Sequence, residues 1–291
     1  MKGVILAGGH GTRLSPLTTV VGKQLLPVYD KPMIYYPLST LILAGVKEVL
    51  LITTPLEVAR FIQLLGDGSQ FGIQIGYETQ ESPKGLAQGI QLASKFTGKD
   101  SFWFILGDNL FHGPDFGLQL GEIPAISDGA HIFAYRVSNP SEYGVVRFSD
   151  RDDSIEELVE KPTQFVSHWA IPGIYYFDNT ANERCREIIP SPRGELEIID
   201  LIKNYSASKN LVAHKISRGN AWFDLGTPDS LLTGGQFVQL IQSRQGMLVG
   251  SPEEASFRRG FLSRETIEER FGDQGRNPYE SAIIQILQEY F

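Results

Sequence analysis

The sequence predicts an α/β fold in which a mixed, mostly parallel β-sheet is flanked by helices. Two observations lead to this prediction. The first 110 residues alternate short apolar runs, typical of buried strands, with helical patterns. Such alternation predicts parallel strands with helices on both faces of the sheet. The chain also has 291 residues, 42% of them hydrophobic, which is enough for one large α/β domain and a small appendage.

The first half of the chain contains strand and helix patterns in strict alternation. Strands are expected at residues 2–6, 48–53, 73–77 and 102–106. Helices are expected at residues 34–44, 56–65 and 86–96. Gly45 directly follows the first helix, where glycine is favoured because it adopts a left-handed backbone. This order of elements indicates a Rossmann-like sheet.

The second half has a mixed pattern and ends in short helices. Strands are expected at residues 131–137, 144–148, 156–160 and 173–177, and a short apolar strand precedes Asp224. Helices are expected at residues 180–188, 197–206 and 228–244, and short helices fill residues 252–291. We therefore predict a main domain at residues 1–245 and a C-terminal helical subdomain at residues 246–291, which forms an interface or carries regulation.

The composition excludes several classes of protein. A net charge of −8 disfavours a nucleic-acid partner, because proteins that bind duplexes are usually basic. The single cysteine, Cys185, excludes an internal disulfide, and no Cys/His cluster has zinc spacing. No segment approaches the roughly 18 apolar residues of a membrane span, and the first apolar run is too short for a signal peptide. We expect a cytoplasmic protein without a membrane partner.

A glycine-rich turn follows the first strand and carries cations. Residues 6–13 read Leu-Ala-Gly-Gly-His-Gly-Thr-Arg, and Lys23 follows ten residues after Arg13. Glycines allow the backbone to approach phosphate oxygens and to direct N–H groups at them. Arg13 and Lys23 can then neutralise a polyphosphate. This pattern predicts a site for a nucleoside triphosphate, although an ordinary tight turn is the alternative for the glycines alone.

Two better-known phosphate loops do not fit the spacing. A P-loop that ends at Lys23 requires glycine at position 17 and Ser or Thr at position 24, where the chain has Leu17 and Gln24. A dinucleotide fingerprint requires a small residue at position 14, where the chain has Leu14. The spacing therefore argues against an NAD-dependent dehydrogenase.

Two acidic residues each follow a predicted strand. Asp108 follows the strand at 102–106, at the edge where ligands bind in open parallel sheets. Asp224 lies between a short apolar strand and a helix. Each alone is also explained as a turn or loop residue. As a pair they could hold Mg²⁺, which takes one or two carboxylates and completes its shell with phosphates and water. Spacing does not show that they meet.

Other polar residues lie near predicted strand ends. Lys161 follows Glu160, which alone is usually a solvated ion pair, and Arg193 precedes a helix. Gln80 offers an amide donor and acceptor, as recognition of a pyrimidine edge requires, although a polar loop also explains it. No histidine has a setting typical of a catalytic triad, and no covalent nucleophile stands out. This favours direct displacement at phosphorus, helped by cations and a metal.

Together, these segments resemble the sugar nucleotidylyltransferases. The matching segments cover nearly the whole chain in the order of the family, and the run from Lys23 is the most specific of them. They are residues 6–14, 23–39, 106–109, 143–145, 160–162, 191–198 and 222–227. The resemblance is to members that transfer dTMP from dTTP to α-D-glucose 1-phosphate, giving dTDP-glucose and pyrophosphate, the first step of dTDP-L-rhamnose or other deoxysugar synthesis.

The resemblance implies a role for each matching residue. Arg13, Lys23, Lys161 and Arg193 would be catalytic, the first two at the triphosphate and the others at the sugar phosphate. Asp108 and Asp224 would hold Mg²⁺. The nucleotide would be bound by Leu6, Gly8, Gly9, Gly11, Thr12, Gln24, Gln80, Gly85 and Asp108. The glucose pocket would be formed by Asn109, Tyr143, Gly144, Glu160, Ile171 and Arg193.

The resemblance also implies assembly and regulation. It predicts a homotetramer and inhibition by dTDP-rhamnose at a second site with Arg218, Glu254 and Arg258. Two alternatives to this function remain. The first is the same chemistry with UTP or another hexose 1-phosphate, because each contact contributes only about 1–3 kcal/mol to discrimination. The second is a sensor of nucleotide sugars without catalysis, which would be free to lose Asp108, Lys161 or Asp224.

Overall fold

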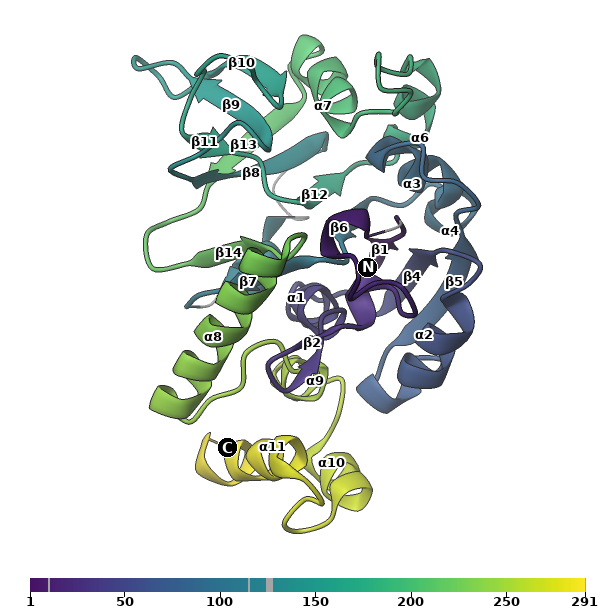
Figure 1. The fold of residues 1–291 in the computed structure, drawn as a ribbon, viewed down its shortest axis with the longest axis vertical. Coiled ribbons are helices and arrows are strands. Elements are labelled where there is room, and N and C mark those ends of the chain that lie inside the picture. Colours follow the sequence, from purple (N-terminus) through teal and green to yellow (C-terminus); the bar gives the residue numbers. More distant parts are fainter. Residues whose placement is uncertain (10, 115, 124–127, 291) are drawn as a thin grey trace.

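A ten-stranded mixed sheet forms the centre of the molecule (Figure 1). The computed structural model describes residues 1–9, 11–114, 116–123 and 128–290, so His10 lies outside the described residues. The strands of the sheet are β1 (Lys2–Ala7), β4 (Glu48–Thr53), β5 (Gln74–Thr79), β6 (Phe102–Leu106), β8 (Ala130–Arg136), β9 (Gly144–Phe148), β10 (Ile155–Glu160), β11 (Trp169–Ala170), β12 (Ile174–Phe177) and β13 (Leu211–Lys215). They run in the order β10-β9-β11-β8-β12-β6-β1-β4-β5, and β13 pairs with β8.

The strands of the first half form a parallel block. Strand β1 pairs in parallel with β4 and β6, and β4 pairs in parallel with β5. Strand β12 then extends the sheet by antiparallel pairing with both β6 and β8. The predicted fold class, a mixed sheet flanked by helices, is thus confirmed. The parallel block matters for function because its strands end together at one edge.

Helices cover both faces of this sheet (Figure 1). The α-helices of the described chain, on the sheet and beyond it, are α1 (Tyr35–Leu43), α2 (Val58–Leu65), α3 (Leu86–Leu92), α4 (Ser94–Thr97), α5 (Phe116–Leu120), α6 (Ala181–Arg184), α7 (Ile198–Ala207), α8 (Pro228–Gln245), α9 (Pro252–Arg258), α10 (Arg264–Phe271) and α11 (Pro278–Tyr290). Two small ribbons complete the fold, one of β2 (Pro27–Val28) with β3 (Lys31–Pro32) and one of β7 (Asn109–His112) with β14 (Ala221–Asp224).

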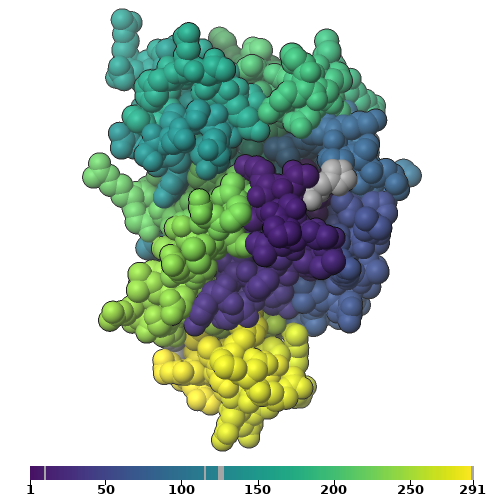
Figure 2. All heavy atoms as spheres, in the orientation of Figure 1, coloured from purple at the N-terminus to yellow at the C-terminus, as the bar shows by residue number. Residues whose placement is uncertain are grey.

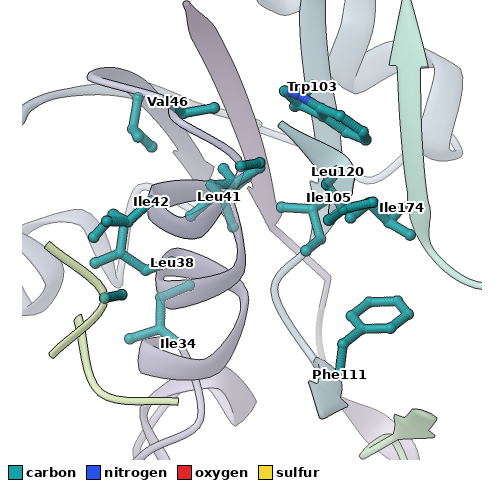
Figure 3. Packing of buried hydrophobic residues seen from close by; sticks show 14 of the residues in the cluster. Ile34, Leu38, Leu41, Ile42, Val46, Trp103, Ile105, Phe111, Leu120 and Ile174 are labelled. Atoms are coloured by element: carbon teal, nitrogen blue, oxygen red, sulfur yellow. The ribbon is translucent and has the colours of Figure 1, made fainter. Parts of the chain in front are cut away.

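Alternate side chains of the parallel strands pack into two separate hydrophobic cores. Ile5 of β1 packs into the cluster that contains α1, which Figure 3 shows from close by. Its neighbour Val4 packs on the opposite face with Ala87 and Ile90 of α3. Successive side chains of a strand point to opposite faces. Both faces of the parallel strands are therefore buried, which explains why these strands appear in the sequence as continuous apolar runs.

The structure departs from the sequence prediction in several elements. The helix expected at 86–96 is divided into α3 and α4 at Ala93, and the helix expected at 180–188 is only α6 followed by one short 3₁₀ turn at Cys185–Glu187. The predicted elements omitted β7, β11 and β13. Two of these are very short, and β13 is only partly buried, with Leu211 and Ala213 packed against the core.

The C-terminal helices form a protrusion at one end of the molecule (yellow in Figure 2). Helices α10 and α11 share a small apolar cluster, which includes Ile267, Ile283 and Leu287. Helix α9 instead packs against α1 of the main body. The division at residue 246 stays a prediction. Within the described part of the chain, no helix is long and apolar enough to cross a membrane.

We predict that Leu41→Ala lowers the free energy of unfolding by about 2–5 kcal/mol, the usual cost of such a cavity. Leu41 is completely buried on α1, and Gly3 of β1 leaves room for it, since a Cβ at Gly3 would lie 2.9 Å from Leu41 Cδ1. Urea unfolding measures the change. The matched control is Leu56→Ala, at a side chain 86% exposed, which should stay within about 0.5 kcal/mol of wild type. Equal losses in both variants would contradict the prediction.

Candidate active site

The carboxyl ends of the parallel strands bring several candidate residues to one edge. Gly8 follows β1, Gln80 follows β5, and Asp108 comes two residues after β6. Backbone hydrogen bonds continue the sheet beyond these ends: Gln80 N–H donates to Thr53 O at 2.7 Å, and Gly107 N–H donates to Leu6 O at 2.9 Å. The loops therefore start from fixed positions, although they are not strands themselves.

The ribbon of β7 and β14 brings the two acids together. Asp224 is paired with Asn109 in the antiparallel register, and Leu225 N–H donates to Asp108 O at 2.9 Å. Asp108 is buried and Asp224 is half-buried. Residues from distant parts of the sequence thus place two carboxylates beside one cavity, a convergence that spacing alone did not show.

The charges around these acids differ. Burial alone would raise the pKa of Asp108, but an ion pair with Lys23 and a hydrogen bond from Asn109 hold this pKa below its ordinary value. Burial and the neighbouring charge of Asp108 raise the pKa of Asp224 to about 6, against the opposing effect of Lys23 and Arg13. The charge of Asp108 is thus compensated by Lys23, whereas that of Asp224 is compensated less well, and a cation bound beside Asp224 would favour its ionised form.

A cavity of about 340 Å³ lies at this edge. It extends from the glycine loop to strands β9 and β10 and helix α7. Predicted site residues that line it are Leu6, Gly8, Gly9, Arg13, Lys23, Gln80, Gly85, Asp108, Asn109, Tyr143, Gly144, Glu160, Lys161, Ile171 and Asp224. Its volume and its mixture of cations, carboxylates and apolar walls are suitable for a phosphorylated small molecule.

The backbone near two of the cations has an unusual feature. Gly226 leaves room for the Arg13 guanidinium, because a Cβ there would lie 2.7 Å from Arg13 Nη2. Lys161 has a positive φ of 42°, which is strained for a residue with a side chain. Its ammonium lies 3.9 Å from Glu160 Oε1. Strain of this kind concentrates at functional sites, so the backbone at Lys161 is consistent with a placed cation.

Arg193 lies outside the lining of the cavity and is surrounded by carboxylates. Its Nη2 donates to Glu197 Oε1 at 2.8 Å and lies 3.7 Å from Glu160 Oε1 and 3.8 Å from Glu195 Oε2. Burial raises the pKa of Glu160, and the nearby carboxylates of Glu197 and Glu195 raise it further. The cations Lys161 and Arg193 oppose this rise.

Three predicted nucleotide-binding residues, Gly11, Thr12 and Gln24, also lie outside the lining of the cavity. Gln24 is buried, and its Nε2 donates to Gly8 O at 3.4 Å.

Asn109 is the centre of a polar network that the sequence did not reveal. Its Oδ1 accepts from Trp222 Nε1–H at 2.7 Å and from Gly173 N–H at 3.1 Å. The Trp222 ring packs edge-on against Tyr143, with ring centroids 5.0 Å apart. Further lining residues missed by sequence reasoning include Tyr175, Glu142, Glu195, Glu197, Ile198 and Ile202. A signal existed for some of them, since Trp222 and 195–198 lie in segments that carried the resemblance.

A second, smaller cavity of about 80 Å³ lies between α1 and α9. Glu254 and Arg258, two of the predicted regulatory residues, line it together with Gly117. Burial raises the pKa of Glu254 to about 7, with Arg258 and Lys31 acting in the opposite direction. Arg218, the third predicted residue, is exposed in the turn after β13 and is not part of the lining.

Comparison with known proteins identifies the family. The family model described as Nucleotidyl transferase matches residues 2–240. Glucose-1-phosphate thymidylyltransferases of Mycolicibacterium smegmatis and Neisseria meningitidis are 47% and 46% identical to this chain, over 99% of it and 99% and 100% of their own lengths. The chain belongs to the glucose-1-phosphate thymidylyltransferase family. It is therefore a nucleotidyltransferase.

Solved structures agree with this family at the level of the fold. A Bacillus anthracis protein assigned as a glucose-1-phosphate thymidylyltransferase, crystallised with sucrose, superposes with a TM-score of 0.76 at 36% identity, over 81% of this chain and 94% of that one. A UDP-glucose pyrophosphorylase with bound UDP-glucose has a TM-score of 0.72 at 23% identity, over 84% of this chain and 99% of that one. The second likeness concerns the fold alone.

We predict that Asp224→Asn stabilises the metal-free protein at pH 8. The folded-state pKa of Asp224, about 6, exceeds its ordinary value of 3.8, so the folded state binds this proton more tightly than the unfolded state. The free energy of unfolding therefore falls as pH rises from about 4 to about 6, and the loss persists above pH 6. Removing the charge should recover about 1–2 kcal/mol at pH 8.

Urea unfolding in EDTA at pH 8 and at pH 4.5 tests this prediction. At pH 4.5 Asp224 is protonated in the folded wild type but mostly ionised in the unfolded chain, where its ordinary pKa is 3.8. The stability advantage of the variant should therefore fall to about a third of its value at pH 8. A variant less stable than wild type at pH 8 would show that the carboxylate contributes favourable contacts that outweigh its burial.

Proposed function

We propose that this chain catalyses Mg²⁺-dependent transfer of dTMP from dTTP to α-D-glucose 1-phosphate, giving dTDP-glucose and pyrophosphate. Near-full-length similarity to glucose-1-phosphate thymidylyltransferases supports the substrates. The observation that carries the chemistry is the convergence of Asp108 and Asp224 beside Lys23 and Arg13 at one cavity. Cations and a carboxylate pair at one edge are the groups that transfer of a nucleotidyl group requires.

The reaction is a direct displacement. A phosphate oxygen of glucose 1-phosphate attacks the α-phosphorus of dTTP and forms a new P–O bond. The bond from the α-phosphorus to the oxygen bridging to the β-phosphorus breaks in line, and pyrophosphate leaves with the electron pair. No nucleophilic side chain of the protein is needed, so the residues act by positioning and by neutralising charge.

The cations divide between the two substrates. Arg13 and Lys23, from the glycine loop and the segment after it, hold the triphosphate and the leaving pyrophosphate. Lys161 and Arg193 hold the phosphate of the sugar and reduce repulsion between the two anions. Arg193 would reach the cavity by turning from Glu197, a rotation within the reach of a long exposed side chain.

The residues present fit a magnesium ion. Asp108 and Asp224 line the same cavity, and burial together with the charge of Asp108 raises the pKa of Asp224, so a cation there would favour the ionised pair. Among the described ranges, no group of three or more His, Cys, Asp or Glu side chains could hold a metal. Mg²⁺ typically takes one or two protein carboxylates and obtains its other ligands from phosphates and water. Bound by Asp108 and Asp224, it would supply charge neutralisation at the phosphates.

The remaining contacts select base and sugar. Gln80 and Gly85 would face the thymine, with Gln24 near the deoxyribose. Close packing supports Gly85 at its position, since a Cβ there would lie 2.4 Å from Leu196 O and its φ is 96°. The glucose would lie among Asn109, Tyr143, Gly144, Glu160 and Ile171. A homotetramer, a cytoplasmic location, a dTDP-rhamnose site with Arg218, Glu254 and Arg258, and a place in deoxysugar synthesis belong to the same proposal.

We predict pyrophosphate release with α-D-glucose 1-phosphate, Mg²⁺ and dTTP, measured beside UTP, dCTP, ATP and GTP. Asp108→Asn should reduce kcat by about 100-fold or more, because it removes a charge that acts at the reacting phosphates. Asp152→Asn, at an exposed loop position, is the matched control and should retain activity. A folded wild-type protein that releases no pyrophosphate with any triphosphate would overturn the function and favour a sensor.

We predict that Arg193→Gln raises KM for glucose 1-phosphate about 10–100-fold, the usual effect of losing one charge-assisted contact. The KM for dTTP should stay within about twofold, because Arg193 acts on the sugar phosphate. Steady-state kinetics with each substrate varied in turn measures the difference. Arg186→Gln, exposed and distant from the cavity lining, is the control. A rise in KM for dTTP alone would assign Arg193 to the triphosphate instead.

A further inference from the structure

The orientation of one side-chain amide at the cavity is fixed by a residue behind it. Gln80 is only 3% exposed but lines the cavity directly after β5. Its Oε1 lies against the glycine loop, where a Cβ on Gly8 would be 2.2 Å away. An amide can usually be rotated by half a turn, which exchanges its oxygen acceptor and its nitrogen donor. Which of them faces a base decides which base is accepted.

Gln88, on α3, removes this freedom. Gln88 Oε1 accepts from the backbone N–H of Lys84 at 2.8 Å, and it also accepts from Gln80 Nε2 at 2.7 Å. A backbone N–H can only donate, so the Gln88 atom that faces it must be the oxygen. That oxygen in turn requires a donor from Gln80, so the Gln80 atom facing Gln88 must be the nitrogen. A backbone group thus fixes both amides in sequence.

The fixed amide presents a defined pattern to the cavity. Across the ranges that the structure describes, no protein donor hydrogen-bonds to Gln80 Oε1, and Nε2 keeps its second hydrogen. One acceptor and one donor are therefore available side by side. The N3–H and O4 of thymine or uracil complement this pair. Cytosine presents an acceptor at N3 and a donor at N4, the reverse order, and would leave both groups mismatched.

We propose that Gln88 is a positioning residue that makes the nucleotide site reject cytosine and that plays no part in distinguishing thymine from uracil. The inference rests on the proposed function, in which Gln80 faces the base. Turning the Gln80 amide to suit cytosine would set its oxygen against Gln88 Oε1, two acceptors with no hydrogen between them. The simpler alternative is that Gln88 only caps the first turn of α3 through Lys84 N–H, in which case base selection would not depend on it.

The test compares Gln88→Met and Gln88→Glu with wild type. Methionine has a similar length but no acceptor, whereas a carboxylate accepts from both Lys84 N–H and Gln80 and is favourable in a first helical turn. In the assay of pyrophosphate release, Gln88→Met should lower the ratio of kcat/KM for dTTP to kcat/KM for dCTP about tenfold. A change of this size corresponds to about one hydrogen bond, because the freed Gln80 amide could turn and bond to cytosine as well. The ratio of dTTP to dUTP should not change, and Gln88→Glu should keep both ratios within about twofold.

The control and a binding measurement make the outcomes distinct. Gln91→Met, on the same helix, removes a hydrogen bond from Gln91 Nε2 to Cys185 O and should leave both ratios unchanged. Calorimetric Kd values for dTTP and dCTP should show the same tenfold change, and thermal unfolding checks that each variant is folded. If Gln88→Met unfolds, Gln88→Ala replaces it.

Three results would overturn the proposal. The first is an unchanged ratio of dTTP to dCTP in the folded variant that lacks an acceptor. The second is an equal decrease in kcat/KM for dTTP, dUTP and dCTP, which is the result expected if Gln88 only caps α3. The third is a Glu variant that discriminates no better than the Met variant. A wild-type protein that binds dTTP over dCTP but releases no pyrophosphate would instead contradict the proposed function and leave the binding comparison to decide the role of Gln88.

Discussion

The site depends on two carboxylates that backbone hydrogen bonds hold together against their mutual repulsion. The pairing of β7 with β14 fixes Asp224 beside Asn109, and Leu225 N–H is bonded to Asp108 O. Neither acid can move apart without breaking that ribbon. The cost appears as the raised pKa of Asp224, caused by burial and by Asp108. An arrangement that is unfavourable for the isolated protein would become favourable on binding the proposed cation with phosphates, and folding elsewhere supplies the stability that it requires.

Charge on the sugar-phosphate side is arranged differently. There the two cations Lys161 and Arg193 face three carboxylates, Glu160, Glu195 and Glu197, which compensate the charge of both cations in the free protein. In the proposed function, an incoming phosphate would have to compete with these carboxylates for Arg193. Such competition would lower affinity for a simple anion and favour a ligand that also forms hydrogen bonds at Glu160 and Asn109. The proposed site would therefore select a phosphorylated sugar over free phosphate.

Sequence reasoning predicted the parallel block and most of the cavity residues, because both are local signals. An apolar run followed by glycines defines where β1 ends, and the end of β6 defines where Asp108 lies. What remained open is nonlocal. The meeting of Asp108 with Asp224 needs the pairing of β7 with β14. The strand before Asp224 was predicted, but β7, with four residues, was not, and the sequence does not show which strand pairs with which. The network of Trp222, Asn109 and Gly173 is nonlocal for the same reason, since each member comes from a different segment.

Gln88 illustrates a further limit of reading motifs. From sequence it is an ordinary helix-forming residue at the start of α3, eight positions after the residue it orients. Its importance arises only when Lys84 N–H, Gln88 and Gln80 form one directional chain. In such a chain the backbone N–H, which can only donate, fixes the orientation of the Gln88 amide. The Gln88 amide then fixes the orientation of the Gln80 amide, whose oxygen and nitrogen could otherwise exchange places. A site that reads hydrogen-bond patterns needs this kind of support behind it, because an amide free to turn would accept both patterns.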